Sequence, residues 1–94
     1  MRKILVIGCG SIGQRHIRAL LSIGEINISA YRTEKGQLVD LDDEIKKDVK
    51  IFKNEDDAFD WEPSHIIISN PTNLHLKYLV KSMQLGTKVF VESQ

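Results

Sequence analysis

Near its start the chain reads Ile4-Leu5-Val6-Ile7-Gly8-Cys9-Gly10-Ser11-Ile12-Gly13. The four apolar residues are typical of a strand that is covered on both faces in a parallel sheet. Three glycines follow at G-x-G-x-x-G spacing, and the segment after them has the apolar spacing of a helix. A strand, a glycine-rich turn and a helix in this order indicate the first half of a β-α-β unit.

The same alternation continues along the chain and predicts the fold. Short β-branched or aromatic runs predict strands at 4–7, 27–31, 49–52, 65–69 and 88–91. Helical patterns lie between them, because each crossover between parallel strands must cover one face of the sheet. The sequence therefore predicts an α/β fold with a doubly wound parallel sheet of the Rossmann type, with about five strands in the order 3-2-1-4-5.

Apolar spacing also predicts which side of each helix is buried. The first helix is expected to bury a stripe made of Ile12, Ala19, Leu20 and Ile23. The last helix is expected to begin at Thr72 and to bury Leu76, Leu79, Val80 and Met83, at spacing i, i+3, i+4, i+7. Asn54, followed by acidic residues, predicts a helix start before the fourth strand.

Composition excludes several kinds of partner. Lysine plus arginine and aspartate plus glutamate number thirteen each, so no net field attracts nucleic acid or an anionic membrane. No apolar run approaches the roughly 20 residues that a bilayer span needs. One cysteine and three histidines, not at ligand spacing, suggest neither a disulfide framework nor a metal site. We expect a cytoplasmic protein without metal.

The glycine loop carries the chemistry. Gly8 permits a tight turn after the strand, Gly10 lets a pyrophosphate approach the backbone, and Gly13 lets the helix pack closely. The free N–H groups around Ser11 and Ile12 then face the phosphates, with the helix dipole adding to the attraction. The sequence predicts a dinucleotide site; a tight turn without a ligand is the alternative.

The residues after the second strand bear on which dinucleotide is bound. An acidic residue there would bind the ribose hydroxyls of NAD, but this chain has Arg32 followed by Thr33. Arg32 can bind a 2′-phosphate or stack on adenine, and Thr33 can donate a further hydrogen bond. The pattern favours NADP over NAD. An ordinary solvated charge at position 32 is the alternative.

Three motifs in order resemble one known family. They are Gly8-Cys9-Gly10-Ser11-Ile12-Gly13-Gln14-Arg15-His16, Ser69-Asn70-Pro71-Thr72-Asn73-Leu74-His75 and Gly86-Thr87-Lys88-Val89-Phe90-Val91-Glu92. Together they resemble the N-terminal domain of the glucose–fructose oxidoreductase / inositol dehydrogenase (Gfo/Idh/MocA) family. The resemblance implies an NAD(P)-dependent oxidoreductase that acts on sugars, cyclitols or their derivatives.

The resemblance also implies roles for individual residues. Asn70, Pro71 and Thr72, at the end of the fourth strand, would contact the nicotinamide side of the cofactor, with His75 nearby. Glu92 matches the first residue of the family's Glu-Lys-Pro motif.

The chain departs from the family pattern after Glu92. The family lysine and proline are replaced by Ser93 and Gln94. We expect residues 1–94 to be a single dinucleotide-binding domain that lacks the family's C-terminal substrate domain and carries no catalytic residue. Such a domain would bind cofactor without turnover.

Two other function classes remain as alternatives. One is a non-catalytic nucleotide-sensing or assembly module, and the other is an S-adenosylmethionine-dependent methyltransferase. Arg32 stands where the methyltransferase would have an acidic residue. The last strand, 88–91, is expected to leave an unpaired edge through which a homodimer or a partner subunit would pair.

Overall fold

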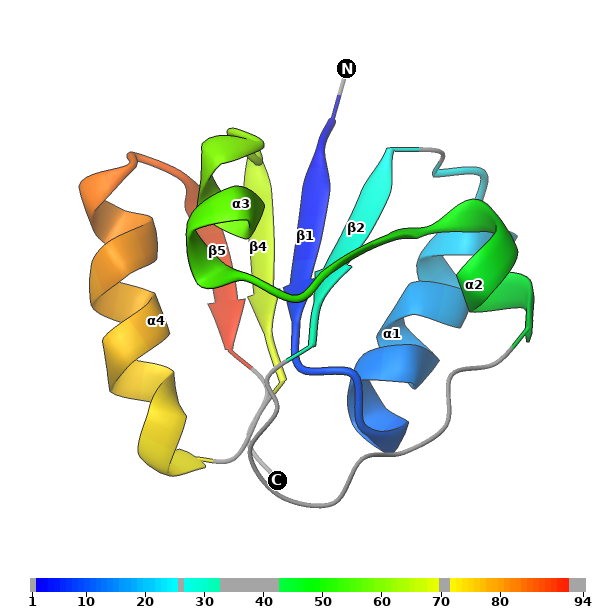
Figure 1. The fold of residues 1–94 in the computed structure, drawn as a ribbon, viewed down its shortest axis with the longest axis horizontal. Coiled ribbons are helices and arrows are strands. Elements are labelled where there is room, and N and C mark those ends of the chain that lie inside the picture. Colours follow the sequence, from blue (N-terminus) through cyan, green and yellow to red (C-terminus); the bar gives the residue numbers. More distant parts are fainter. Residues whose placement is uncertain (1, 26, 33–42, 70–71, 92–94) are drawn as a thin grey trace.

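The computed structural model describes residues 2–25, 27–32, 43–69 and 72–91, with the backbone alone described at Ser11 and at 72–75. Within these ranges five parallel strands form one sheet with helices on both faces (Figure 1). The strands are β1 (Ile4–Ile7), β2 (Ile28–Tyr31), β3 (Lys50–Phe52), β4 (His65–Ile68) and β5 (Lys88–Val91). The helices are α1 (Ser11–Ser22), α2 (Asp43–Asp48), α3 (Glu55–Asp60) and α4 (Thr72–Gln84).

The strand order is β3-β2-β1-β4-β5, which confirms the predicted order. Ile4 of β1 pairs with Ile28 of β2 on one side and with His65 of β4 on the other. All four residues of β1 are buried, as an uninterrupted apolar run requires at the centre of a parallel sheet. The chain leaves β1 toward β2 and β3 and later returns to β4, so the order reverses beside β1, where ligands of open α/β sheets bind.

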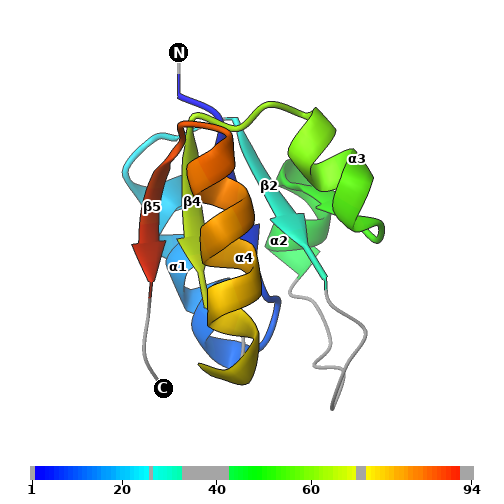
Figure 2. The ribbon, with the colours of Figure 1, turned by 90° about the vertical axis from the view of Figure 1, so that its left-hand side faces the viewer.

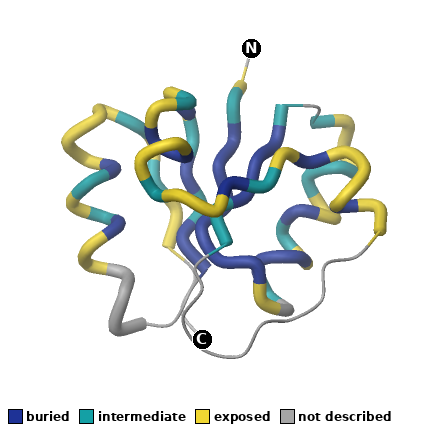
Figure 3. Tube along the Cα trace, viewed as in Figure 1, coloured by how far each residue is buried: buried dark blue, intermediate teal, exposed yellow. Residues whose placement is uncertain are grey.

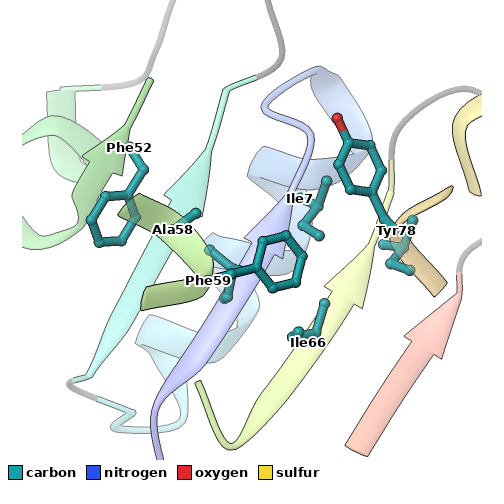
Figure 4. Close-up of a cluster of buried hydrophobic side chains, with 8 residues drawn as sticks. Ile7, Phe52, Ala58, Phe59, Ile66 and Tyr78 are labelled. Carbon is teal, nitrogen blue, oxygen red and sulfur yellow. The ribbon is translucent and has the colours of Figure 1, made fainter. Parts of the chain in front are cut away.

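Two cores lie on opposite faces of the sheet, because successive side chains of a strand point to opposite sides. Figures 1 and 2 show α1 and α2 over one face and α3 and α4 over the other. The core beneath α3 and α4 consists of Leu5, Ile7, Phe52, Ala58, Phe59, Ile66, Ile68 and Tyr78 (Figure 4). The core beneath α1 and α2 consists of Val6, Cys9, Ile17, Ile28, Ala30, Ile45 and Val49.

The helix α3 begins where the sequence predicts. The Asn54 side chain accepts hydrogen bonds from the N–H groups of Asp56 and Asp57, at 2.8 and 3.3 Å. These bonds satisfy two of the donors that a helix start leaves without intrahelical partners. Phe59 is buried, as expected of a core residue.

The predicted buried stripe of α1 was wrong in part. Ile17 is fully buried and Leu20 is half-buried against the same core, but Ala19 is exposed and Ile23 is 74% exposed. Gly13 lies against the loop after β1, which fixes the rotation of the helix. The face that meets the sheet therefore runs through 13, 17 and 20, and Ile23 lies outside it.

The predicted buried stripe of α4 was also wrong in part: Leu79 packs against the core, but Leu76, Val80 and Met83 are exposed. Leu76 and Met83 are 70% and 66% exposed, whereas Tyr78 and Ser82 are buried (Figure 3). Tyr78 places its ring edge-on to Tyr31, with the ring centroids 6.0 Å apart. Ser82 fits beneath the helix because its hydroxyl donates to the carbonyl of Tyr78 at 2.7 Å. Residues 76, 79, 80 and 83 form one stripe at helical spacing, and residues 78 and 82 lie on a neighbouring stripe. Because Tyr78 packs against Tyr31, the second and less apolar stripe faces the sheet.

Candidate functional site

The candidate site lies at the edge of the sheet toward which all strands point. Figure 1 shows the beginnings of α1 and α4 at this edge. The N–H of Gly8 donates to the carbonyl of Tyr31 at 3.0 Å, and the N–H of Ser69 donates to that of Ile7 at 2.9 Å. These bonds bring together the glycine loop, the end of β2 and the end of β4. The glycine loop, Arg32 directly after β2 and Ser69 directly after β4 therefore lie at one edge of the sheet.

The three glycines occupy three different environments. Gly8 has φ +103°, a conformation that side-chain-bearing residues rarely adopt. A Cβ on Gly13 would lie 2.0 Å from the carbonyl oxygen of Gly8, so no side chain fits there. A Cβ on Gly10 would meet no atom within 4 Å. The protein itself thus requires glycine at 8 and 13, whereas the space beside Gly10 is open.

The start of α1, next to this open space, has no side-chain cap. Gly10 is its N-cap residue and supplies no side-chain cap, and the first turn carries no acidic residue. The first hydrogen bond of the helix runs from the N–H of Gln14 to the carbonyl of Gly10 at 2.9 Å. The N–H groups of Ser11, Ile12 and Gly13 therefore have no intrahelical partner, and the positive end of the helix dipole lies beside them. This arrangement suits an anion such as a phosphate.

Arg32 supplies positive charge near the loop. Its N–H donates to the carbonyl of Phe52 at 3.0 Å, which fixes the backbone directly after β2. Its guanidinium acts on Cys9 by lowering the pKa of that thiol, but burial has the larger effect and raises the pKa to about 11. Cys9 is therefore a protonated, buried thiol at neutral pH, which fits a small core residue rather than a nucleophile.

Two tyrosines pack against each other at this edge, on the face of the sheet that α3 and α4 cover. Tyr31 ends β2, and the ring of Tyr78 of α4 meets it; Figure 4 shows Tyr78 beside Ile7 of β1. Burial, and then a hydrogen bond with Tyr31, raise the pKa of Tyr78 above its ordinary value. The Tyr78 phenol therefore stays neutral at physiological pH, and the contact between the two rings joins β2 to α4.

Two buried polar residues behind the loop were not among the predicted site residues. Gln14 and Ser69 are each 4% exposed, and both donate to carbonyl oxygens of the loop. The signal for them in the sequence was their polarity at positions where the fold demands burial.

Several predicted site residues lie outside the described residues. These are Thr33, Asn70, Pro71 and Glu92. Thr72 and His75 are described by backbone alone, in the first turn of α4 at the same edge as the glycine loop.

Within the described ranges, no group of three or more His, Cys, Asp or Glu side chains is placed to hold a metal ion. In the same part of the chain, none of the helices is both long and apolar enough to cross a bilayer.

A parallel sheet in this order, with a glycine turn between β1 and α1, defines a Rossmann-type dinucleotide-binding domain. Residues 2–93 match the model of the GFO_IDH_MocA family, described as an oxidoreductase family with an NAD-binding Rossmann fold. The chain belongs to this family, and the resemblance drawn from its motifs is confirmed. No curated protein and no solved structure matches it significantly.

Proposed function

We propose that this domain holds NADP, or less tightly NAD, with the pyrophosphate on the first turn of α1. One observation carries the proposal. The first turn of α1 has no side-chain cap, and the space beside Gly10 is open, whereas Gly8 is required by its positive φ and Gly13 by its close packing. Gly8, Gly10, Ser11, Ile12 and Gly13 would then contact the pyrophosphate.

The preference for NADP rests on the charge at the end of β2. Arg32 follows Tyr31 at the edge of the sheet, where the adenosine ribose of a bound dinucleotide would lie. A guanidinium binds a 2′-phosphate with charge-assisted hydrogen bonds, which a ribose hydroxyl does not equal. Thr33 would add a further donor on the same side.

The nicotinamide side of the site is assigned from the family pattern. Asn70, Pro71, Thr72 and His75 follow β4, and Glu92 follows β5. Both strands end at the same edge of the parallel sheet, beside the glycine loop. We propose that these residues hold the nicotinamide half of the cofactor.

We further propose that the complete reaction is hydride transfer to or from a sugar- or cyclitol-like substrate. Hydride transfer requires donor and acceptor carbons about 3–3.5 Å apart. We propose that residues 1–94 form the single dinucleotide-binding domain that would hold the cofactor for this transfer.

A titration that pairs the wild type with Gly10→Ala tests the proposal. Gly10 has φ −76° and ψ −171°, which alanine adopts readily, and its Cβ would enter open space. The variant should fold like the wild type yet lose binding, because the new methyl group occupies the place of the pyrophosphate. Calorimetry should show NADP and NAD binding to the wild type, with roughly 2.7 kcal/mol of stabilisation at 100 times the dissociation constant. Equal binding by both proteins, or by neither, would overturn the assignment.

An assembly module is the second candidate function, and the exposed apolar side chains of α4 and β5 favour it. Phe90 and Leu76 are 59% and 70% exposed. Within the described ranges β5 pairs with β4 alone, which leaves its outer edge open. We propose that a homodimer or a partner subunit pairs with residues 88–91.

We propose that the protein is cytoplasmic, because a free thiol is compatible with a reducing compartment. Cys9 is the one cysteine of the sequence and is buried as a free thiol. A reducing compartment keeps such a thiol in this state. Labelling of intact cells, followed by fractionation, would test the location.

A further inference from the structure

The carbonyl groups of the glycine loop all point away from the open space beside Gly10. The carbonyl of Ile7 accepts from the N–H of Ser69, and that of Gly10 accepts from the N–H of Gln14. The carbonyl of Gly8 lies against Gly13, where a Cβ would come within 2.0 Å of it. A carbonyl oxygen that faced a phosphate would repel it, so this orientation matters for an anion site.

Two buried side chains hold these carbonyls. The Ser69 hydroxyl, at the end of β4, lies 3.0 Å from the carbonyl oxygen of Ile7 and 3.3 Å from that of Gly8. The Gln14 side-chain amide, on α1, donates to the carbonyl oxygen of Cys9 at 3.0 Å. Both side chains are 4% exposed, so they act from behind the loop and do not reach its open side.

The orientation of each carbonyl fixes the N–H group of the next residue. In a trans peptide the C=O and the N–H point in opposite directions, and the described chain contains no cis peptide bond. When Gly8 and Cys9 turn their oxygens inward, the N–H groups of Cys9 and Gly10 turn outward. Glycine tolerates nearly all backbone angles, so a peptide plane next to Gly8 or Gly10 would rotate at little cost if nothing held it.

We propose that Ser69 and Gln14 are positioning residues that lock these two peptide planes in the phosphate-binding orientation. Ser69 sets the plane between Gly8 and Cys9, and Gln14 sets the plane between Cys9 and Gly10. Neither side chain touches the cofactor. The proposal deepens the cofactor-binding function and rests on it, since the locked planes serve the pyrophosphate.

Affinity measurements on matched variants test whether Ser69 and Gln14 hold the two peptide planes. Ser69→Ala removes the hydroxyl, and Gln14→Met keeps the length of the side chain without its N–H. Ser82→Ala is the control, because its hydroxyl is also fully buried and donates to a carbonyl, but within α4. At a temperature where all variants are folded, calorimetry should show about five- to tenfold weaker binding of NADP for the two loop variants and no change for Ser82→Ala.

A purely structural role would lower the melting temperature of all three variants and leave their affinities equal. That result would contradict the positioning role of Ser69 and Gln14 and would leave the proposed cofactor binding unaffected. Gln14→Met keeps the test informative if Ser69→Ala does not fold.

A measurement without ligand separates this proposal from the proposed function. Residual dipolar couplings report the direction of the N–H bonds of Cys9 and Gly10. The coupling of Cys9 should change in Ser69→Ala and that of Gly10 in Gln14→Met, with both unchanged in Ser82→Ala. If the wild type binds no dinucleotide, the cofactor function fails, and the couplings still decide whether the planes are locked. Unchanged couplings in both loop variants would show that these side chains do not hold the peptide planes.

Discussion

Gly13 and Gly8 are in direct backbone contact across the turn between β1 and α1. A Cβ added to Gly13 would lie 2.0 Å from the carbonyl oxygen of Gly8 and 2.9 Å from the Ser69 hydroxyl. The contact fixes both the rotation of α1 and the inward direction of the Gly8 carbonyl. A single glycine thus connects the packing of a helix with the shape of the candidate phosphate site.

We expect Gly13→Ala to destabilise the domain by about 1–3 kcal/mol, because backbone atoms must move to admit the methyl group. Urea denaturation measures the change in the free energy of unfolding. Gly10→Ala is the matched control and should shift that free energy by less than about 1 kcal/mol, since its Cβ meets no atom within 4 Å. Equal losses in the two variants would contradict the close contact.

The strand order and the position of the loop were predictable from the sequence. The apolar run Ile4–Ile7 and the glycine spacing after it depend on local rules, and right-handed crossovers leave few possible topologies. The orientation of the helices was not predictable in the same way. Tyr78 rather than Leu76 faces the sheet, because the ring of Tyr31 lies edge-on to it from another strand.

The supporting residues of the site were missed for a related reason. Ser69 bonds to the loop from the end of another strand, 61 and 62 residues along the chain, and the Gln14 side chain bonds back to the Cys9 carbonyl from the first turn of α1. Such bonds depend on how β4 and α1 approach the loop in space, which spacing along the sequence does not encode. The glycines themselves were found because each imposes a local backbone condition.

We expect Arg32→Gln to weaken NADP binding by about 10- to 100-fold and to change NAD binding little, because a charge-assisted hydrogen bond to a phosphate contributes about 1.5–3 kcal/mol. Calorimetric titration of both cofactors gives the ratio. Lys46→Gln, which removes an exposed charge on α2, is the control for a general electrostatic effect. Equal losses for both cofactors would count against a role of Arg32 in selecting NADP.

The buried thiol of Cys9 should make the domain less stable at alkaline pH. Its pKa rises to about 11 in the folded protein from an ordinary value of 9.0, because burial disfavours the thiolate. The stabilisation is therefore complete below pH 9 and is lost as the pH rises toward 11, up to about 2–3 kcal/mol. Unfolding of the wild type and of Cys9→Ala between pH 8 and 11 measures it. The difference between the two should shrink across this window; a constant difference would show that the thiol has the same pKa in the folded and unfolded states.

Glu55 links the start of α3 to α4 and should stabilise the domain in a pH-dependent way. Its carboxylate lies 2.9 Å from Lys81 and 3.2 Å from Lys77. Burial alone would raise the pKa of Glu55, but the hydrogen bonds from the two lysines outweigh it and lower the pKa. The folded state thus favours the ionised form, so this stabilisation is present above pH 4.5 and is lost as the pH falls below it.

We accordingly expect Glu55→Gln to cost about 0.5–1 kcal/mol at pH 7 and much less near pH 3, a small effect because the lysines are partly solvated. Asp60→Asn, at the exposed end of α3, controls for the loss of one negative charge. A cost that is the same at both pH values would indicate lost packing instead of a lost ion pair.

The outer edge of β5 should control association of the domain. The N–H of Lys88 donates to the carbonyl of Ser64, so it points toward β4. Directions alternate along a strand, and the N–H of Val91 therefore points outward, away from β4. Val91→Pro removes this outward donor without removing a bond to β4, so it should convert a dimer of the wild type into a monomer. Sedimentation velocity measures the change.

Leu85→Lys, which alters an exposed apolar residue in the turn before β5, should leave the dimer intact if edge pairing holds it together. A wild type that remains monomeric at high concentration would refute the proposed edge interface, and a dimer that persists in Val91→Pro would place the contact on another surface.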